Sequence, residues 1–184
     1  MTSDPWQGPS GSDGPPPPDP AAPPEADHEA VARKVLLDQL TGRARSRHEL
    51  ADKLRGRLVP DDVADRLLDR FAEIGLIDDE AFARAWVSER HRSKGLAPRA
   101  LTQELRRKGI DDETVRAAVD EVTDDDQESA ARALVRRKLR SLGQVDQATA
   151  TRRLAGMLAR KGYSPGLCFR VVKDELGADL TEEL

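Results

Sequence analysis

Apolar side chains recur every three or four residues along most of the chain, which is the spacing of one face of an α-helix. Leu101 and Leu105 follow this spacing, and so do Val115, Val119 and Val122. Polar and charged residues fill the positions between them. No run of alternating apolar and polar residues competes, so the pattern predicts helices and no strands.

Residues typical of helix ends separate these apolar runs. In the middle of the chain, one of the aspartates at 78–79 caps a helix that ends at Gly95, and Pro98 opens the next helix. Gly109 ends that second helix and Asp111 starts a third. The middle of the chain therefore predicts a unit of three helices.

The same arrangement returns with a constant offset of 53 residues. The superposed positions are Leu101, Leu105, Arg107, Lys108, Gly109, Ile110, Asp111, Val115 and Val119 in one copy, and Leu154, Leu158, Arg160, Lys161, Gly162, Tyr163, Ser164, Cys168 and Val172 in the other. An earlier copy includes Leu50, Leu54, Val63 and Leu67, and its alignment needs a one-residue gap where a glycine before Leu58 would stand. The sequence thus predicts three copies of one unit.

The two outer copies carry helix-end signals of their own. In the first copy, Ser46 and Glu49 form a capping box, and the third helix opens at Pro60, buries Val63, Leu67, Phe71 and Ile74, and ends at Gly75. In the third copy, Gly143 and Gly162 end the first two helices, and Ser164 with Pro165 opens the last. About nine helices are expected in all.

These observations predict an all-α fold of three tandem three-helix repeats in an elongated array, at residues 28–77, 78–123 and 124–184. We expect neighbouring repeats to stack, because each is too small to bury much core alone. Residues 1–27 hold nine of the 12 prolines and five acids but no Lys or Arg. Such a segment cannot offset the entropy of ordering, so a disordered tail is predicted there.

The net charge of −4 suggests at first that the protein avoids nucleic acids. The distribution of charge changes this view, because the tail takes five acids and leaves a body of net charge +1. Residues 33–57, 84–108 and 132–161 carry net charges of +5, +6 and +8, and acidic blocks separate them. The first two helices of each repeat are therefore basic, which predicts a positive stripe for a polyanion or an acidic protein.

The bases most suited to contact such a partner lie in the second and third repeats. A solvated helix face is the alternative interpretation of the same residues. The candidate set is Arg84, Arg90, Arg92, Lys94, Arg99, Arg106, Arg107, Lys108, Arg136, Arg137, Lys138, Arg153, Arg160 and Lys161.

Motifs for catalysis and for cofactor or metal binding are missing from the sequence. It has no glycine-rich phosphate loop, and its three histidines lack metal-ligand spacing. Cys168 takes the repeat position of Val115, which predicts a buried apolar role. Phe82 and Trp86 form a core pair or, alternatively, a stacking platform for bases. We expect a non-enzyme without cofactor or metal.

The single cysteine suits a reducing compartment, and no run of about 18 apolar residues or secretory signal is found. A cytoplasmic protein without a membrane partner is therefore expected.

Three stretches of the middle repeat, at residues 78–87 (DDEAFARAWV), 94–99 (KGLAPR) and 103–110 (QELRRKGI), resemble the RecX family of regulatory proteins. The resemblance covers about residues 30–177 and includes 74–77 (IGLI). The missing glycine of the first copy and the Pro-rich N-terminal extension depart from the family pattern.

The resemblance implies three tandem three-helix repeats and no catalytic residues. It also implies binding to the RecA recombinase, in the groove of its filament on single-stranded DNA, and limited filament extension. ATP hydrolysis, homologous recombination, DNA repair and self-cleavage of the SOS repressor would then fall. A monomer is expected. The alternative is a helical regulator that binds DNA directly, because short units with basic second helices also suit helix-turn-helix proteins.

Overall fold

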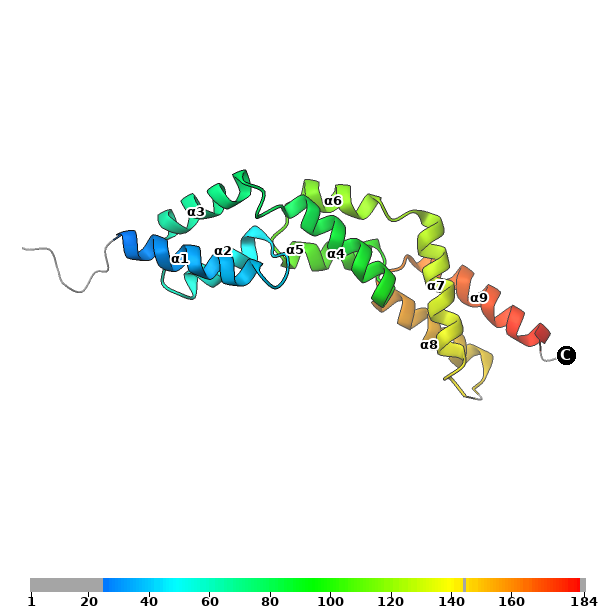
Figure 1. Ribbon diagram of the computed structural model, residues 1–184. Helices are drawn as coiled ribbons and strands as arrows, with labels where there is room; N and C mark the ends of the chain where they lie inside the picture. Colours follow the sequence, from blue (N-terminus) through cyan, green and yellow to red (C-terminus); the bar gives the residue numbers. More distant parts are fainter. Residues whose placement is uncertain (1–24, 144, 183–184) are drawn as a thin grey trace, which may run out of the picture.

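The computed structural model describes residues 25–143 and 145–182, and these form nine α-helices without a strand. The helices are α1 (Glu25–Leu40), α2 (Arg47–Arg55), α3 (Asp61–Glu73), α4 (Asp79–Lys94), α5 (Pro98–Arg107), α6 (Asp112–Asp120), α7 (Asp124–Leu139), α8 (Gln147–Arg160) and α9 (Pro165–Glu182). They pack in consecutive threes, which we call unit 1, unit 2 and unit 3. The units follow one another along an elongated body (Figure 1). The predicted all-α fold of three repeats is confirmed.

The predicted tail falls almost wholly outside the described residues. Residues 25–27 belong to α1. None of the helices in the described residues combines the length and the apolar composition that a membrane span requires.

Caps fix the helix starts where the sequence places them. Ser46 accepts a hydrogen bond from the amide of Glu49, whose side chain returns to Ser46, so the capping box is present. Asp78 caps α4 and Asp111 caps α6 through side-chain oxygens. Gly95 ends α4 in the left-handed conformation, with φ of 59°. The helix boundaries of unit 2 thus follow directly from the cap residues.

Each unit has a hydrophobic core of its own. The deepest positions are pairs of leucines four residues apart on the middle helices, all with no exposed surface: Leu50 and Leu54, Leu101 and Leu105, Leu154 and Leu158. Burying one such side chain stabilises a fold by about 1.5–3 kcal/mol. The three cores are separate clusters, and Ala97 at the start of α5 belongs to the cluster of unit 3.

The middle helices end in one repeated turn. The amides of Val59, Ile110 and Tyr163 donate to the carbonyls of Leu54, Leu105 and Leu158 over 3.2–3.3 Å. The residue before each donor has positive φ, at 73° in Gly109 and 92° in Gly162. Leu58 holds this position in unit 1 with φ of 58°. The expected one-residue gap is therefore wrong, because Leu58 itself takes the glycine's place in the left-handed region.

Two further details of the sequence prediction are wrong. Ile74 is 62% exposed and not part of the core, because α3 ends at Glu73 and the chain turns away through Gly75. Gly143 does not terminate α7, which ends at Leu139, although it does have a positive φ of 66°. Neither difference alters the three-unit plan.

Neighbouring units meet through the ends of their middle helices. The Ser46 hydroxyl donates to the carbonyl oxygen of Lys108 over 2.7 Å, and the Ala97 amide donates to that of Lys161 over 2.9 Å. In each case the residue that caps the N-terminus of one middle helix bonds the C-terminal cap of the next. We call these contacts junction 1–2 and junction 2–3.

Candidate partner-binding surface

The predicted partner-binding bases lie on the first two helices of units 2 and 3. Helix α4 carries Arg84, Arg90, Arg92 and Lys94, and α5 with its C-terminal cap carries Arg99, Arg106, Arg107 and Lys108. Helix α7 carries Arg136, Arg137 and Lys138, and α8 with its cap carries Arg153, Arg160 and Lys161. Most are exposed. Many fall in last turns, where the helix dipole favours cations.

The side chains of Arg90 and Lys108 pack against the ring of Trp86. The Phe82 and Trp86 rings stack at 5.6 Å between centroids. The Arg90 guanidinium lies 4.2 Å and the Lys108 ammonium 4.7 Å from the Trp86 ring centroid, within cation–π range. The Trp86 indole donates to Glu104 over 2.9 Å. This cluster is typical of a packed core edge and does not leave the ring open as a stacking platform.

Lys108 also joins units 1 and 2. Its ammonium donates to Glu49 over 2.6 Å, and both side chains are less than a quarter exposed. Burial opposes ionisation of Glu49, but the hydrogen bonds from Lys108 and from the Ser46 amide hold the pKa of this carboxyl below its ordinary value. Lys108 is therefore an internal structural contact.

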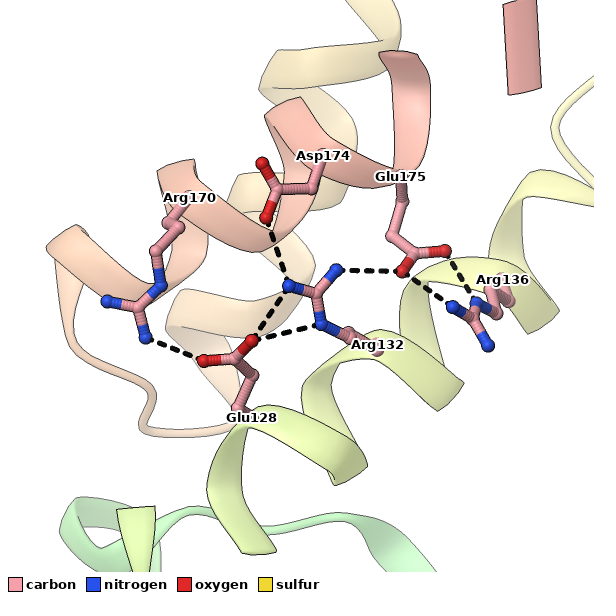
Figure 2. A network of polar contacts seen from close by, with 6 residues as sticks. All are labelled: Glu128, Arg132, Arg136, Arg170, Asp174 and Glu175. Atoms are coloured by element: carbon pink, nitrogen blue, oxygen red, sulfur yellow. Dashed lines mark hydrogen bonds and ion pairs between the residues drawn. The ribbon is translucent and has the colours of Figure 1, made fainter. Parts of the chain in front are cut away.

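Arg136 belongs to a network between α7 and α9 (Figure 2). It donates two hydrogen bonds to Glu175, which is only 6% exposed, and Arg132 donates a third. The hydrogen bonds from Arg136, and to a smaller extent the one from Arg132, lower the pKa of Glu175. Arg132 also bonds Glu128 over 2.7 Å and Asp174 over 3.0 Å. Arg136 thus helps to hold unit 3 together.

The network also contains residues that sequence reasoning missed, above all Glu175. Counted from the cap of the third helix in each unit, Glu175 takes the position of Phe71 and Val122. Phe71 is buried and Val122 packs against the core of unit 2. A carboxylate at an otherwise apolar position signals a buried ionic partner. Alignment of the repeats could therefore have singled out Glu175 from the sequence.

Two other predicted bases make only exposed pairs. Arg84 lies 3.6 Å from Glu80, and Arg106 bonds Asp112 over 2.8 Å, with every side chain at least half exposed. Such surface pairs contribute little to stability and leave the bases available to a partner.

The remaining predicted bases have no carboxylate partner within the described part of the chain. They are Arg92, Lys94, Arg99, Arg107, Arg137, Lys138, Arg153, Arg160 and Lys161. The first two helices of units 2 and 3 therefore present bases that no carboxylate of the described residues contacts. Such a surface can attract and bind an anionic partner.

The single cysteine and the single tyrosine of the chain both lie in the core of unit 3. No group of three or more His, Cys, Asp or Glu side chains in the described residues is placed to hold a metal ion. Cys168 is buried, as predicted, and burial raises the pKa of its thiol, which disfavours the nucleophilic thiolate. Tyr163 donates to the Gly95 carbonyl, and burial raises its pKa to about 12. Both residues act as core.

Comparison with known proteins agrees with this architecture. Three family models match: "RecX, first three-helix domain" at residues 32–71, "RecX, second three-helix domain" at 78–119 and "RecX, third three-helix domain" at 124–172. The chain is 49% identical over 172 residues to "Regulatory protein RecX" of Thermobifida fusca (strain YX), covering 94% of this chain and 91% of the relative. It is also 49% identical over 153 residues to that of Streptomyces lividans, covering 83% and 81%.

Solved structures share the fold. The crystal structure of RecX from Lactobacillus salivarius superposes with a TM-score of 0.74 at 22% identity, covering 82% of this chain and 97% of the other. A second crystal structure, of regulatory protein RecX, gives a TM-score of 0.74 at 26% identity, covering 82% and 74%.

Proposed function

This chain belongs to the RecX family, and from that premise we propose that it is a non-enzymatic regulator that binds filaments of the RecA recombinase on single-stranded DNA and inhibits their extension. Shorter filaments contain fewer active protomers, so ATP hydrolysis, strand exchange and coprotease activity fall together. Homologous recombination, DNA repair and the SOS response are the processes affected. A RecA partner places this action in the cytoplasm, and we propose that the protein acts as a monomer.

One observation supports this proposal above the others: bases without internal carboxylate partners recur on the first two helices of successive units. Arg99 and Arg107 lie on α5, and Arg153 lies on α8, all exposed. Acids are concentrated instead on the third helices and the helix starts, such as Asp112 and Glu113 of α6. An elongated body with repeated positive patches suits a partner that is itself a long repeating polyanion (Figure 1).

The repeated basic patches explain how the protein can bind a filament although each single contact is weak. Each patch makes a weak contact, but once one unit has bound, the others act at a high effective concentration on neighbouring sites. A filament offers such sites at regular spacing, whereas an isolated protein does not. Outside residues 1–27 the chain is nearly neutral overall, at a net charge of +1, which disfavours tight attachment to bulk DNA. The molecule can therefore prefer the filament over naked nucleic acid.

The alternative is a regulator that binds DNA directly. It predicts tight, sequence-selective binding to naked duplex DNA, with affinity that falls steeply as salt rises. The filament regulator predicts weak binding to naked DNA and strong binding to RecA filaments. A mobility-shift series over salt concentration with and without RecA separates the two.

The direct test is the ATPase rate of RecA on single-stranded DNA, titrated with the purified full-length chain. Inhibition is expected. Inhibition at a small fraction of the RecA concentration indicates capping of filament ends, and inhibition only near equal amounts indicates coating of the groove. An unchanged ATPase rate at a molar excess of the chain would contradict the proposed function.

A further inference from the structure

Junctions 1–2 and 2–3 share one backbone design. At each junction, a glycine follows the C-terminal cap of one middle helix. This glycine packs against the start of the middle helix in the preceding unit. A Cβ atom on Gly109 would lie 2.3 Å from the side chain of His48, and one on Gly162 would lie 2.5 Å from the amide nitrogen of Ala100. Only glycine permits this approach. The two junctions can therefore be compared position by position.

The comparison shows a difference in charge. In junction 1–2 the third residue of α2 is Glu49, which neutralises Lys108. The third residue of α5 is Ala100, so junction 2–3 has no acid at this place. Lys161, the counterpart of Lys108, donates instead to the backbone carbonyl of Lys94. Its charge has no carboxylate partner within the described residues.

Two further bases lie beside Lys161. Its hydrogen bond fixes the ammonium at the C-terminal end of α4, next to Lys94 itself. Gly95 packs closely on Leu134 of α7, and Arg137 follows Leu134 by one helical turn on the same face. Burial and the charges of Arg137 and Lys94 lower the pKa of Lys161, as a cluster of like charges requires. Three cations thus converge from α4, α7 and α8.

The protein itself offsets this charge only in part. The cluster lies where three helices end, and each C-terminus contributes roughly half a negative charge. Three full positive charges therefore leave an excess of about one and a half. Mutual repulsion of this kind costs stability unless an anion binds. Lys94 and Arg137 are both exposed, so an anion from solution can reach them.

We propose that Lys94, Arg137 and Lys161 form a binding site for a backbone phosphate group of single-stranded nucleic acid. The guanidinium of Arg137 can bind two phosphate oxygens side by side, and the two ammonium groups can bind as point charges. The site lies between units 2 and 3, so a bound phosphate also bridges the two units. The inference deepens the proposed function, because it assigns phosphate as the ligand of one part of the basic surface.

The surroundings favour nucleic acid over an acidic protein. Protein interfaces bury apolar anchors at their centres, whereas backbone contacts to nucleic acids are polar and strongly positive. The exposed large apolar residues of the described chain lie elsewhere: Val31, Leu37, Leu58, Ile74, Leu76 and Phe169. Trp86 is covered by its neighbours, so bases are not read by stacking on it. Binding at this site is expected to be independent of base sequence.

The test uses the full-length chain and a fluorescent oligothymidylate, without RecA, with affinity measured over a salt series. Arg137→Gln and Lys94→Gln are each expected to weaken binding about five- to tenfold and to reduce the slope of log affinity against log salt by about 0.7, the value for one phosphate of a single strand. The matched control is Arg116→Gln, because Arg116 is an exposed base on the acidic helix α6. It should change neither quantity.

A second variant addresses the comparison between junctions. Ala100→Glu gives junction 2–3 the carboxylate that Glu49 provides in junction 1–2, and it should abolish the phosphate contact to the same extent as Arg137→Gln. Circular dichroism and the melting temperature show whether each variant is folded. If Ala100→Glu does not fold, the Arg137 and Lys94 variants decide alone.

Equal affinities and salt slopes for the Arg137, Lys94 and Arg116 variants would overturn the proposal. It also fails if the substitutions weaken binding to a poly-glutamate peptide and leave the oligothymidylate unaffected, because the site then serves a protein carboxylate. Inhibition of RecA by the unaltered chain is measured separately. The phosphate site and the proposed function can therefore fail independently.

Discussion

The ammonium of Lys108 and the carboxylate of Glu49 lie 2.6 Å apart across the junction of units 1 and 2. The two residues are 59 positions apart in the sequence. Their pairing makes an apparent partner-binding base part of the protein's own structure. It also distinguishes this junction from junction 2–3, where no carboxylate of the described residues contacts the equivalent Lys161.

Loss of this pair should destabilise the protein. Glu49→Gln is expected to lower the free energy of unfolding by about 1–2 kcal/mol, because a charged and mostly buried hydrogen bond is weakened. Asp52→Asn is the control, since Asp52 pairs with Arg55 on the open surface and should cost less than about 0.5 kcal/mol. Urea unfolding of both variants measures the difference. Equal losses would show that Lys108 and Glu49 do not hold the junction.

Glu175 should make the stability of unit 3 depend on pH. Its pKa in the folded protein is lowered from the ordinary value of 4.5 by the guanidinium groups of Arg136 and Arg132. The folded state is therefore stabilised above pH 4.5 and loses this contribution as the pH falls through the lowered value. Glu175→Gln should cost about 2 kcal/mol at neutral pH, less than a fully buried pair because Arg136 remains partly in water.

The measurement is the melting temperature of the wild type and of Glu175→Gln between neutral and acidic pH. The two curves should converge as the pH falls, because protonation removes the same charge from the wild type. A constant difference over the whole range would contradict the assigned network.

Leu58→Gly should stabilise the protein by about 0.5–1 kcal/mol. A leucine in the left-handed region costs about 1–2 kcal/mol, and glycine removes this strain at a smaller cost in unfolded-state entropy. Arg57→Gly is the control, because Arg57 lacks the positive φ of its neighbour and should lose stability. Thermal unfolding compares the stability of the two variants. A Leu58→Gly variant less stable than the wild type would contradict the backbone strain assigned to Leu58.

The contact of Gly162 with Ala100 predicts a larger penalty than backbone strain alone. Gly162→Ala and Gly75→Ala both place a side chain at positive φ, at 92° and 74°. A Cβ on Gly75 meets no atom within 4 Å, whereas one on Gly162 meets the Ala100 backbone. Gly162→Ala should therefore cost about 1–3 kcal/mol more than Gly75→Ala. Chemical denaturation tests this, and equal penalties would exclude a tight junction.

The sequence was sufficient to predict the elements of the fold, because its signals are local. Ser46, Asp78 and Asp111 cap the helices that follow them, and the leucine pairs four residues apart lie in the cores. Ile74 fits the helical spacing of α3 but lies beyond its last turn, where spacing no longer reports burial. The leucine at 58 misled the alignment because only the backbone conformation reveals its equivalence to glycine.

The candidate surface was predictable only as a set of charges. Sequence spacing places Arg136 and Arg137 alike in the last turn of α7. Only the fold shows that the first bonds Glu175 and that the charge of the second acts on Lys161. Whether a base is neutralised depends on acids that are distant in the sequence, and no local pattern contains that information.

The central claim is that unpaired bases on units 2 and 3 bind RecA filaments, and charge reversal tests it most directly. The triple variant Arg99→Glu, Arg107→Glu and Arg153→Glu removes three exposed bases that have no carboxylate partner in the described chain. A control triple with the same change in net charge reverses Arg66, Arg70 and Arg116 on the acidic helices α3 and α6.

The decisive quantity is the concentration of each folded variant that halves the ATPase rate of RecA on single-stranded DNA. Each lost charge contact is expected to weaken binding several-fold, so the first triple should require at least about a hundredfold more protein, whereas the control triple should stay within about threefold of wild type. Equal inhibition by the two folded triples would contradict the account.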